Sequence, residues 1–178
     1  MNKIKKVLGS IIFILVNPID IRFYNRYLGD FFILSRIKAL RLMGMKIGNN
    51  TRVHSNFYTN NPSLISIGNN CEVGRHSEIW AYSQINIGDS VEIGSRLYMN
   101  SSNHNFTTNS KVPLSKQGAY SLPISIDKNI WVGANVNILA GVYIEKDVVV
   151  GANSVVNKNL TEGFVYAGSP ARKINEIK

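Results

Sequence analysis

Residues 126–156 read IDKNIWVGANVNILAGVYIEKDVVVGANSVV, and an aliphatic side chain occupies every sixth position of this stretch. These positions are Ile126, Val132, Ile138, Ile144, Val150 and Val156. A period of six fits neither the 3.6 residues per turn of an amphipathic helix nor the simple alternation of a strand. It is typical of a solenoid in which each coil has three short faces and each face turns one aliphatic side chain inward.

The same period begins earlier in the chain. Its earlier members are Ile67, Val73, Ile79, Ile85, Ile87, Ile93 and Met99, with a shift of phase between Ile85 and Ile87. Ile47, Ile67 and Ile87 are spaced by 20 residues, whereas Ile126 and Ile144 are spaced by 18. Three hexapeptides therefore complete one coil of the predicted solenoid.

Polar residue pairs recur where such a coil must turn. They follow an Ile-Gly or Ile-acid pair at Asn49-Asn50, Asn69-Asn70, Asp89-Ser90, Lys128-Asn129 and Lys146-Asp147. Asn and Asp tolerate left-handed backbone geometry better than most residues. Each pair therefore predicts a corner between two faces.

Composition limits the class of protein. The chain has 178 residues, is 44% hydrophobic and contains one cysteine, which excludes an intramolecular disulfide framework and favours one compact domain. Cys71 occupies a hexapeptide position that suits a small, partly inward side chain, so we expect it to pack rather than react. Residues 1–46 carry nine basic and two acidic side chains, a net +7 of the chain's +9. This local excess favours a polyanionic neighbour for that segment.

The first 46 residues lack the six-residue period. Lys3, Lys5 and Lys6 precede an apolar run, Val7–Val16, that has no cleavage site after it and is too short to span a bilayer. Further along, aromatic and aliphatic residues such as Phe23 and Tyr24 recur at spacings of three and four among basic residues. We expect one or two basic amphipathic helices that cap the open end of the solenoid. Their charge also suits peripheral contact with an anionic membrane, whereas no recognisable nucleic-acid-binding module accompanies it.

The period disappears between residues 100 and 123. This segment is polar, rich in turn residues and contains His104, which makes it the natural place for a site. His54 and His76 occupy different places in their hexapeptides and should point in different directions, so we expect structural roles for both and predict no metal site.

Two further segments connect the chain to a known family. Residues 130–136 (IWVGANV) and residues 167–172 (AGSPAR), together with the Ile-Gly hexapeptides, resemble the hexapeptide-repeat acyltransferases over about residues 44–174. This resemblance implies a left-handed parallel β-helix, a homotrimer with active sites between subunits, and acetyl-CoA as co-substrate. The predicted organisation is a basic helical cap (1–46), a β-helix (47–161) with an active-site loop (100–123), and a C-terminal cap (162–178).

The resemblance also assigns roles to residues. It implies that His104 is the general base, that the backbone N–H groups around Gly133 and Ala134 face the thioester carbonyl, and that Trp131 borders the cofactor arm. Trp131 could equally be a packing aromatic. Candidate cofactor contacts are Gly151, Ala152, Lys158, Arg172 and Lys173. Candidate acceptor contacts are Trp80, Tyr82, Tyr98 and Asn100, outward residues that could instead fill a trimer interface.

These observations predict an acetyl-CoA-dependent O-acetyltransferase that modifies a sugar or glycan by direct transfer, in bacterial surface-polysaccharide biosynthesis. The predicted location is the cytoplasm, with residues 1–46 as the candidate contact to the inner membrane. Two alternatives stay open. One is N-acetylation of an amino sugar nucleotide or a xenobiotic, and the other is a β-helical scaffold without activity.

Overall fold

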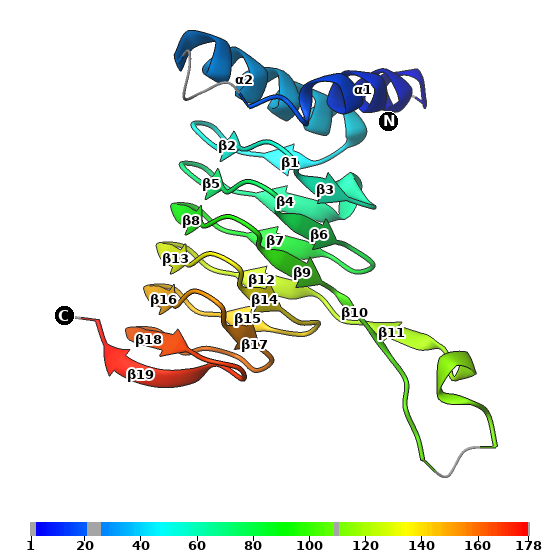
Figure 1. Cartoon of the computed structure of the whole chain (residues 1–178), viewed down its shortest axis with the longest axis vertical. Coiled ribbons are helices and arrows are strands. Elements are labelled where there is room, and N and C mark those ends of the chain that lie inside the picture. Colours follow the sequence, from blue (N-terminus) through cyan, green and yellow to red (C-terminus); the bar gives the residue numbers. More distant parts are fainter. Residues whose placement is uncertain (1–2, 21–25, 109–110, 178) are drawn as a thin grey trace.

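The computed structural model describes residues 3–20, 26–108 and 111–177, and Figure 1 shows a prism of stacked coils beneath two helices. Sheet A contains β1 (Lys46–Ile47), β4 (Ile65–Ile67), β7 (Ile85–Ile87), β12 (Ile124–Ile126) and β15 (Tyr143–Ile144). Sheet B contains β2 (Arg52–Val53), β5 (Glu72–Val73), β8 (Val91–Ile93), β13 (Ile130–Val132), β16 (Val148–Val150), β18 (Phe164–Ala167) and β19 (Arg172–Glu176). Sheet C contains β3 (Tyr58–Thr59), β6 (Glu78–Trp80), β9 (Tyr98–Asn100), β14 (Asn137–Ile138) and β17 (Val155–Val156).

Each coil contributes one strand to sheets A, B and C in turn, and a short 3-10 helix, η1 (Pro62–Leu64), precedes β4. Within these sheets neighbouring strands are parallel except for β18 and β19, which run antiparallel at the end of sheet B. Residues at the inward positions stack on their equivalents: Ile65, Ile85 and Ile124 are cross-strand partners and at most 1% exposed. The predicted β-helix of hexapeptide repeats is confirmed.

The corners also form as the polar pairs predicted. The second residue of each pair has a positive φ of 54° to 56°, at Asn50, Asn70, Ser90, Asn129 and Asp147. The corners between sheets B and C, like those between sheets A and B, place glycines against the next coil. A Cβ at Gly94 would lie 2.7 Å from the Ala134 nitrogen, closer than real contacts allow, so glycine permits this coil spacing.

Cys71 lies inside the solenoid. It is 3% exposed, and its thiol donates hydrogen bonds to the carbonyl oxygens of Gly88 (3.1 Å) and Asn69 (3.3 Å). Burial raises the pKa of this thiol above its usual range. The packing role expected for Cys71 is consistent with these contacts.

Thiol labelling of the folded chain should therefore be slower than labelling in denaturant by about 10²-fold or more. Burial raises the pKa of the Cys71 thiol in the folded chain only. The free energy of unfolding should therefore fall as the pH rises above the ordinary thiol pKa of about 8.5, because the thiol of the unfolded chain loses its proton first. Since Cys71 is the single cysteine, one labelling time course measures this site alone. Rapid stoichiometric labelling without denaturant would contradict its burial.

Two helices, α1 (Lys3–Val16) and α2 (Arg26–Met43), lie side by side over the first coil (Figure 1). A Cβ at Gly9 would lie 2.8 Å from the Leu42 Cβ and 2.9 Å from the Ala39 carbonyl oxygen, so glycine lets the helices touch. Phe23 and Tyr24 of the predicted helical segment lie outside the described residues. None of the helices in the described part of the chain is both long and apolar enough to cross a membrane.

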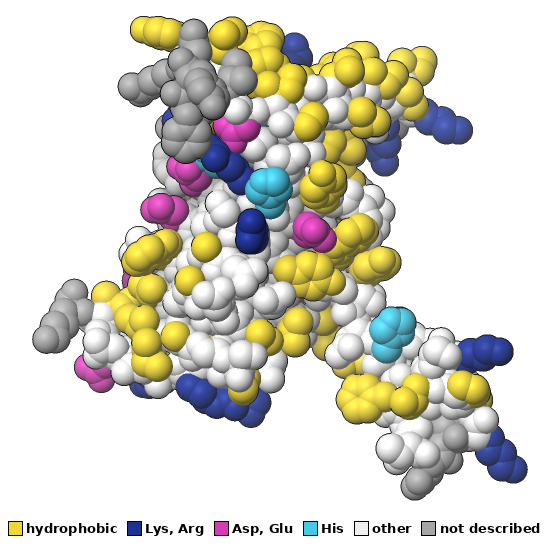
Figure 2. Space-filling model, in the orientation of Figure 1, with side chains coloured by type: hydrophobic (Ala, Val, Ile, Leu, Met, Phe, Trp, Pro, Cys, Tyr) yellow, Lys and Arg dark blue, Asp and Glu magenta, His cyan; other side chains and the backbone are white. Residues whose placement is uncertain are grey.

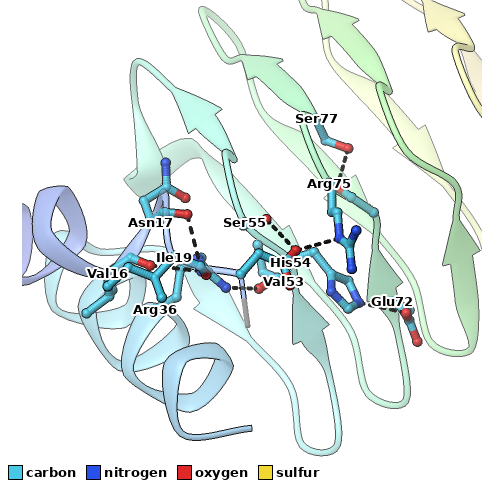
Figure 3. Close-up of polar contacts among 12 residues, drawn as sticks. Val16, Asn17, Ile19, Arg36, Val53, His54, Ser55, Glu72, Arg75 and Ser77 are labelled. Carbon is cyan, nitrogen blue, oxygen red and sulfur yellow. Dashed lines mark hydrogen bonds and ion pairs between the residues drawn. The ribbon is translucent and has the colours of Figure 1, made fainter. Parts of the chain in front are cut away.

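Arg36 joins the helices to the solenoid (Figure 3). Its side chain is 1% exposed and donates to the carbonyl oxygens of Val53 (2.9 Å), Val16 (2.9 Å), Asn17 (3.2 Å) and Ile19 (3.0 Å). Burial lowers the pKa of Arg36 to about 10, against an opposing effect of Asp20, so the guanidinium is charged at neutral pH. One side chain thus holds the end of α1, α2 and the first coil together.

Candidate active site

The segment that interrupts the repeat forms a projecting arm (Figure 1). It consists of β10 (Ser102–His104), a 3-10 helix η2 (Leu114–Lys116) and β11 (Ala119–Ser121), with β10 and β11 paired antiparallel. This differs from the expected patternless loop. The chain leaves the solenoid after β9 and returns at β12, so the two sides of the excursion run together and satisfy each other's backbone groups.

His104 lies at the outer end of β10, opposite Ala119 of β11. Its side chain is exposed, and its backbone N–H donates to the Asn103 side-chain oxygen at 2.9 Å. Among the described residues, none forms a hydrogen bond or ion pair with the His104 ring. The paired backbone therefore holds an imidazole whose nitrogens are available to a ligand.

The predicted acceptor residues gather at the base of this arm. Trp80 and Asn100 are cross-strand partners on sheet C, and the Asn100 amide donates to the Tyr98 hydroxyl at 3.3 Å. Tyr82 follows in the next turn, is 55% exposed, and donates its backbone N–H to the Ser101 hydroxyl at 2.8 Å. The structure therefore places Trp80, Tyr98 and Asn100 close together on sheet C, with Tyr82 in the turn that follows Trp80.

Trp131 lies elsewhere, on sheet B. It is 57% exposed, and its cross-strand partners are Glu92 and Val149. Gly133 and Ala134 follow at the corner between sheets B and C. The corner of Gly133 and Ala134 lies at the beginning of a sheet C strand, whereas the arm follows the end of the sheet C strand β9. A single chain therefore places His104 and Trp131 on different parts of the prism.

The backbone N–H groups at this corner are not equivalent. The Gly133 N–H donates to the Val150 carbonyl at 2.7 Å, and the Gly151 N–H donates to the Tyr166 carbonyl at 2.7 Å. Ala134 and Ala152 are exposed, and no acceptor for their N–H groups occurs among the described residues. The coil ladder thus uses the N–H groups of Gly133 and Gly151, and the N–H groups of Ala134 and Ala152 make no backbone bond to any described residue.

The predicted phosphate-binding cations separate into two places. Arg172 is the cross-strand partner of Ala167. The Cβ of Ala167 lies 3.0 Å from the place that a Cβ on Gly151 would occupy, so Arg172 lies near the corner that contains Ala152. The Lys173 ammonium lies 2.9 Å from the Phe164 ring centroid. Lys158 follows β17 and lies at the corner between sheets C and A, where the arm leaves its own coil. One compact cluster of all three cations does not form.

A polar cavity near the corner between sheets B and C was not predicted from the sequence. It has a volume of ≈ 310 Å³ and is lined by His54, Glu72, Gly74, Arg75, Glu92, Ile93, Gly94 and Ser95. The His54 Nε2 and Glu72 Oε1 atoms lie 2.7 Å apart, and the His54 side chain is 7% exposed (Figure 3). The strand register was the signal that could have revealed this cavity, because Glu72 pairs with Glu92 and Glu92 pairs with Trp131 on neighbouring strands.

The cavity adjoins the corner that carries the free amide. Gly94 lines the cavity, and the Ala134 nitrogen lies directly beneath Gly94 in the next coil. Within the described residues, no group of three or more His, Cys, Asp or Glu side chains could hold a metal ion. The corner can thus offer an amide donor and carboxylates to one bound molecule.

Comparisons with known proteins agree with this architecture. A family model described as the hexapeptide repeat of succinyl-transferase matches residues 123–158. Galactoside O-acetyltransferase of Escherichia coli is 47% identical over 58 residues, which are 33% of this chain and 29% of that protein. The chain thus spans about 30% of the length of the curated relatives it matches first.

Solved structures match over nearly the whole chain. A galactoside acetyltransferase in complex with coenzyme A is 26% identical, covers 98% of this chain and 81% of its own, and has a TM-score of 0.73. A hexapeptide-repeat acetyltransferase of Vibrio cholerae complexed with acetyl-CoA is 23% identical, with coverage of 99% and 88% and a TM-score of 0.79. The shared repeat over residues 123–158 and the shared coils show that this chain has the hexapeptide-repeat β-helix fold of these acetyltransferases.

Proposed function

We propose that this protein transfers the acetyl group of acetyl-CoA to a hydroxyl of a sugar or glycan. The observation that supports the proposal is the arm, which carries the exposed His104 and leaves the solenoid directly after Asn100, where Trp80 and Tyr98 also lie. Aromatic and amide side chains of this kind suit the faces and hydroxyls of a sugar. The coenzyme A complex of the galactoside acetyltransferase supports the choice of acyl donor.

The proposed chemistry needs two groups from the protein. A sugar hydroxyl is a poor nucleophile, and a neutral imidazole at His104 can take its proton as the oxygen attacks the thioester carbon. The new C–O bond forms, the C–S bond breaks, and the imidazolium returns the proton to the leaving sulfur. The N–H of Ala134 stabilises the negative oxygen of the tetrahedral intermediate. No acyl-enzyme is required.

The two groups come from different subunits in this proposal. Within one chain, His104 and Ala134 lie on different parts of the prism, so a neighbouring copy has to bring its arm to the corner of Ala134. A closed homotrimer supplies three such sites by symmetry. Arg172, near Ala152, would then meet a phosphate of coenzyme A as a charge-assisted pair.

The acceptor side includes the polar cavity. Glu72 and Glu92 are cross-strand partners that line it, and carboxylates accept hydrogen bonds from sugar hydroxyls. The same pair of carboxylates favours a second candidate acceptor, the ammonium group of an amino sugar. Acceptor profiling separates the two, because an O-acetyltransferase should consume neutral sugars that lack an amine.

Titration calorimetry with coenzyme A tests the proposal against an inactive scaffold. We expect saturable heat, because the free amides and cations at the corner should recognise the coenzyme. Arg172→Ala should weaken this binding, whereas Lys46→Ala, an exposed cation at the helical end, serves as the control. Absence of heat with folded protein would favour the scaffold.

The proposed role of the Ala134 N–H predicts different kinetic effects for proline at position 134 and proline at position 152. Ala134→Pro removes an N–H that makes no bond within the described residues, and it should lower kcat by about 10²–10³-fold. Ala152→Pro is the matched control at the same corner of the next coil, and it should mainly raise KM for acetyl-CoA. Steady-state kinetics of both variants provide the measurement. Equal losses of kcat would point to a distorted corner and remove the assignment to Ala134.

A further inference from the structure

We propose that α1 and α2 dock on an anionic lipid bilayer through apolar side chains that the fold leaves uncovered. This inference concerns location and does not depend on the proposed acetyl transfer. Figure 2 shows hydrophobic side chains gathered over the two helices at the top of the molecule. Four observations identify the surface and its partner.

The first observation is that α1 is apolar on two opposite sides. Its inner side, at Gly9 and Phe13, packs against α2 and the core. Its outer side, which we call the outer stripe, follows the helical spacing of three and four. The outer stripe consists of Ile4, Val7, Leu8, Ile11, Ile14 and Leu15, with exposed fractions of 50% to 73%. A helix that is apolar all round is a buried helix, so the outer stripe requires a cover.

The second observation is that α2 continues the apolar surface. Tyr27, Phe31 and Leu34 follow one another at helical spacing and are 88%, 60% and 65% exposed. Lys38 continues this row toward the end of the helix and is exposed, whereas Arg41 donates to the carbonyl oxygens of Ile47 and Gly48 in the first coil. Aromatic rings followed by a cation match the boundary between acyl chains and charged headgroups.

The third observation concerns charge. Lys3, Lys5 and Lys6 are exposed on α1, which contains no acidic residue. The acidic residues of the cap face the solenoid instead: Asp20 pairs with Arg75, and Asp30 pairs with Arg52. The solenoid therefore binds the negative charges of the cap, and the outward surface is left apolar and basic. That combination is complementary to an anionic leaflet.

The fourth observation is length. The 14 residues of α1 fall short of the roughly 20 needed to span a bilayer, and Gly9 and Arg36 fix the helix to α2 and the first coil. The helix would therefore lie along the surface, with the outer stripe among the acyl chains and the lysines at the headgroups. The solenoid and its arm would stay in water.

Vesicle sedimentation of the full-length protein tests this proposal. The probes are phosphatidylcholine vesicles with and without phosphatidylglycerol. Wild type should bind the anionic vesicles at least about tenfold more tightly than the neutral ones and release at high salt. Val7→Ser/Ile11→Ser and Lys3→Gln/Lys5→Gln/Lys6→Gln should each lose at least about tenfold in binding. Ile174→Ser/Ile177→Ser, which alters exposed aliphatics at the other end of the chain, should bind like wild type.

Two results would overturn the proposal. Full recovery of the wild type in the supernatant with anionic vesicles is the first. The second is a serine variant that keeps its vesicle binding but changes its molar mass by light scattering, which would show that a second copy covers the outer stripe. Circular dichroism of each variant establishes that α1 is still helical, so loss of binding is separable from loss of the helix.

Discussion

His104→Ala is expected to lower turnover by about 10²–10⁴-fold while the protein stays folded. The imidazole is exposed at the end of β10, and its ring makes no hydrogen bond to any described residue, so its removal costs the fold little. The loss should instead appear in proton removal from the acceptor hydroxyl. Initial rates of coenzyme A release, compared at saturating acetyl-CoA, measure it.

Lys116→Ala provides the control for that variant, since Lys116 is an exposed residue of the same arm. It should retain wild-type turnover and the same thermal unfolding temperature. An unchanged rate in His104→Ala would remove the imidazole from the mechanism. An equal loss in both variants would show that the arm acts through its shape.

Complementation tests whether two chains share the site. Protomers with His104→Ala and protomers with Ala134→Pro are each inactive in this account, but a mixed trimer pairs an intact arm with an intact corner. Random mixing in equal amounts should restore about one quarter of wild-type activity. If the mixture is as inactive as its components, both groups belong to one chain.

Arg36→Met is expected to lower the free energy of unfolding by about 3–5 kcal/mol. The guanidinium is almost fully buried, and its loss removes the donor to the carbonyl oxygens of Val53 and Ile19, whereas the Val16 carbonyl still accepts from the Ile19 N–H at 3.3 Å. Denaturant titration measures the change, and hydrogen exchange should show the greatest loss of protection in α1.

Arg36→Lys is the matched variant because it retains the charge but lacks the planar fork that reaches several carbonyls. Its stability should fall between wild type and Arg36→Met. If Arg36→Met unfolds like wild type and α1 keeps its protection, the buried guanidinium does not hold the cap.

The coils were predictable because their signal is local. An aliphatic residue at every sixth position fixes the inward face, and a polar pair such as Lys128-Asn129 fixes a corner, so composition and spacing are sufficient. The antiparallel pairing of β10 with β11 was not predictable in this way, because Asn103 and Tyr120 meet only after the chain reverses. Hydrophobic periodicity does not report such pairing.

The candidate site was predictable only in part. Gly133 and Ala134 are adjacent in sequence, yet only the Gly133 N–H donates a hydrogen bond to the next coil. This difference can be predicted only once the register of the strands is known. Lys158 and Arg172 looked equivalent as cations near the chain end, but a three-sided prism places them at different corners. His54 was judged alone, although its carboxylate partner, Glu72, lies 18 residues away.

Release of free coenzyme A from acetyl-CoA in the presence of a panel of neutral sugars, oligosaccharides and amino sugars tests the central proposal most directly. We predict thiol release that depends on a hydroxyl-bearing sugar without an amine and that falls by about 10²-fold or more in His104→Ala. Thiol release that no sugar accelerates beyond acetyl-CoA hydrolysis, or that is equal in wild type and His104→Ala, would contradict the proposed transferase.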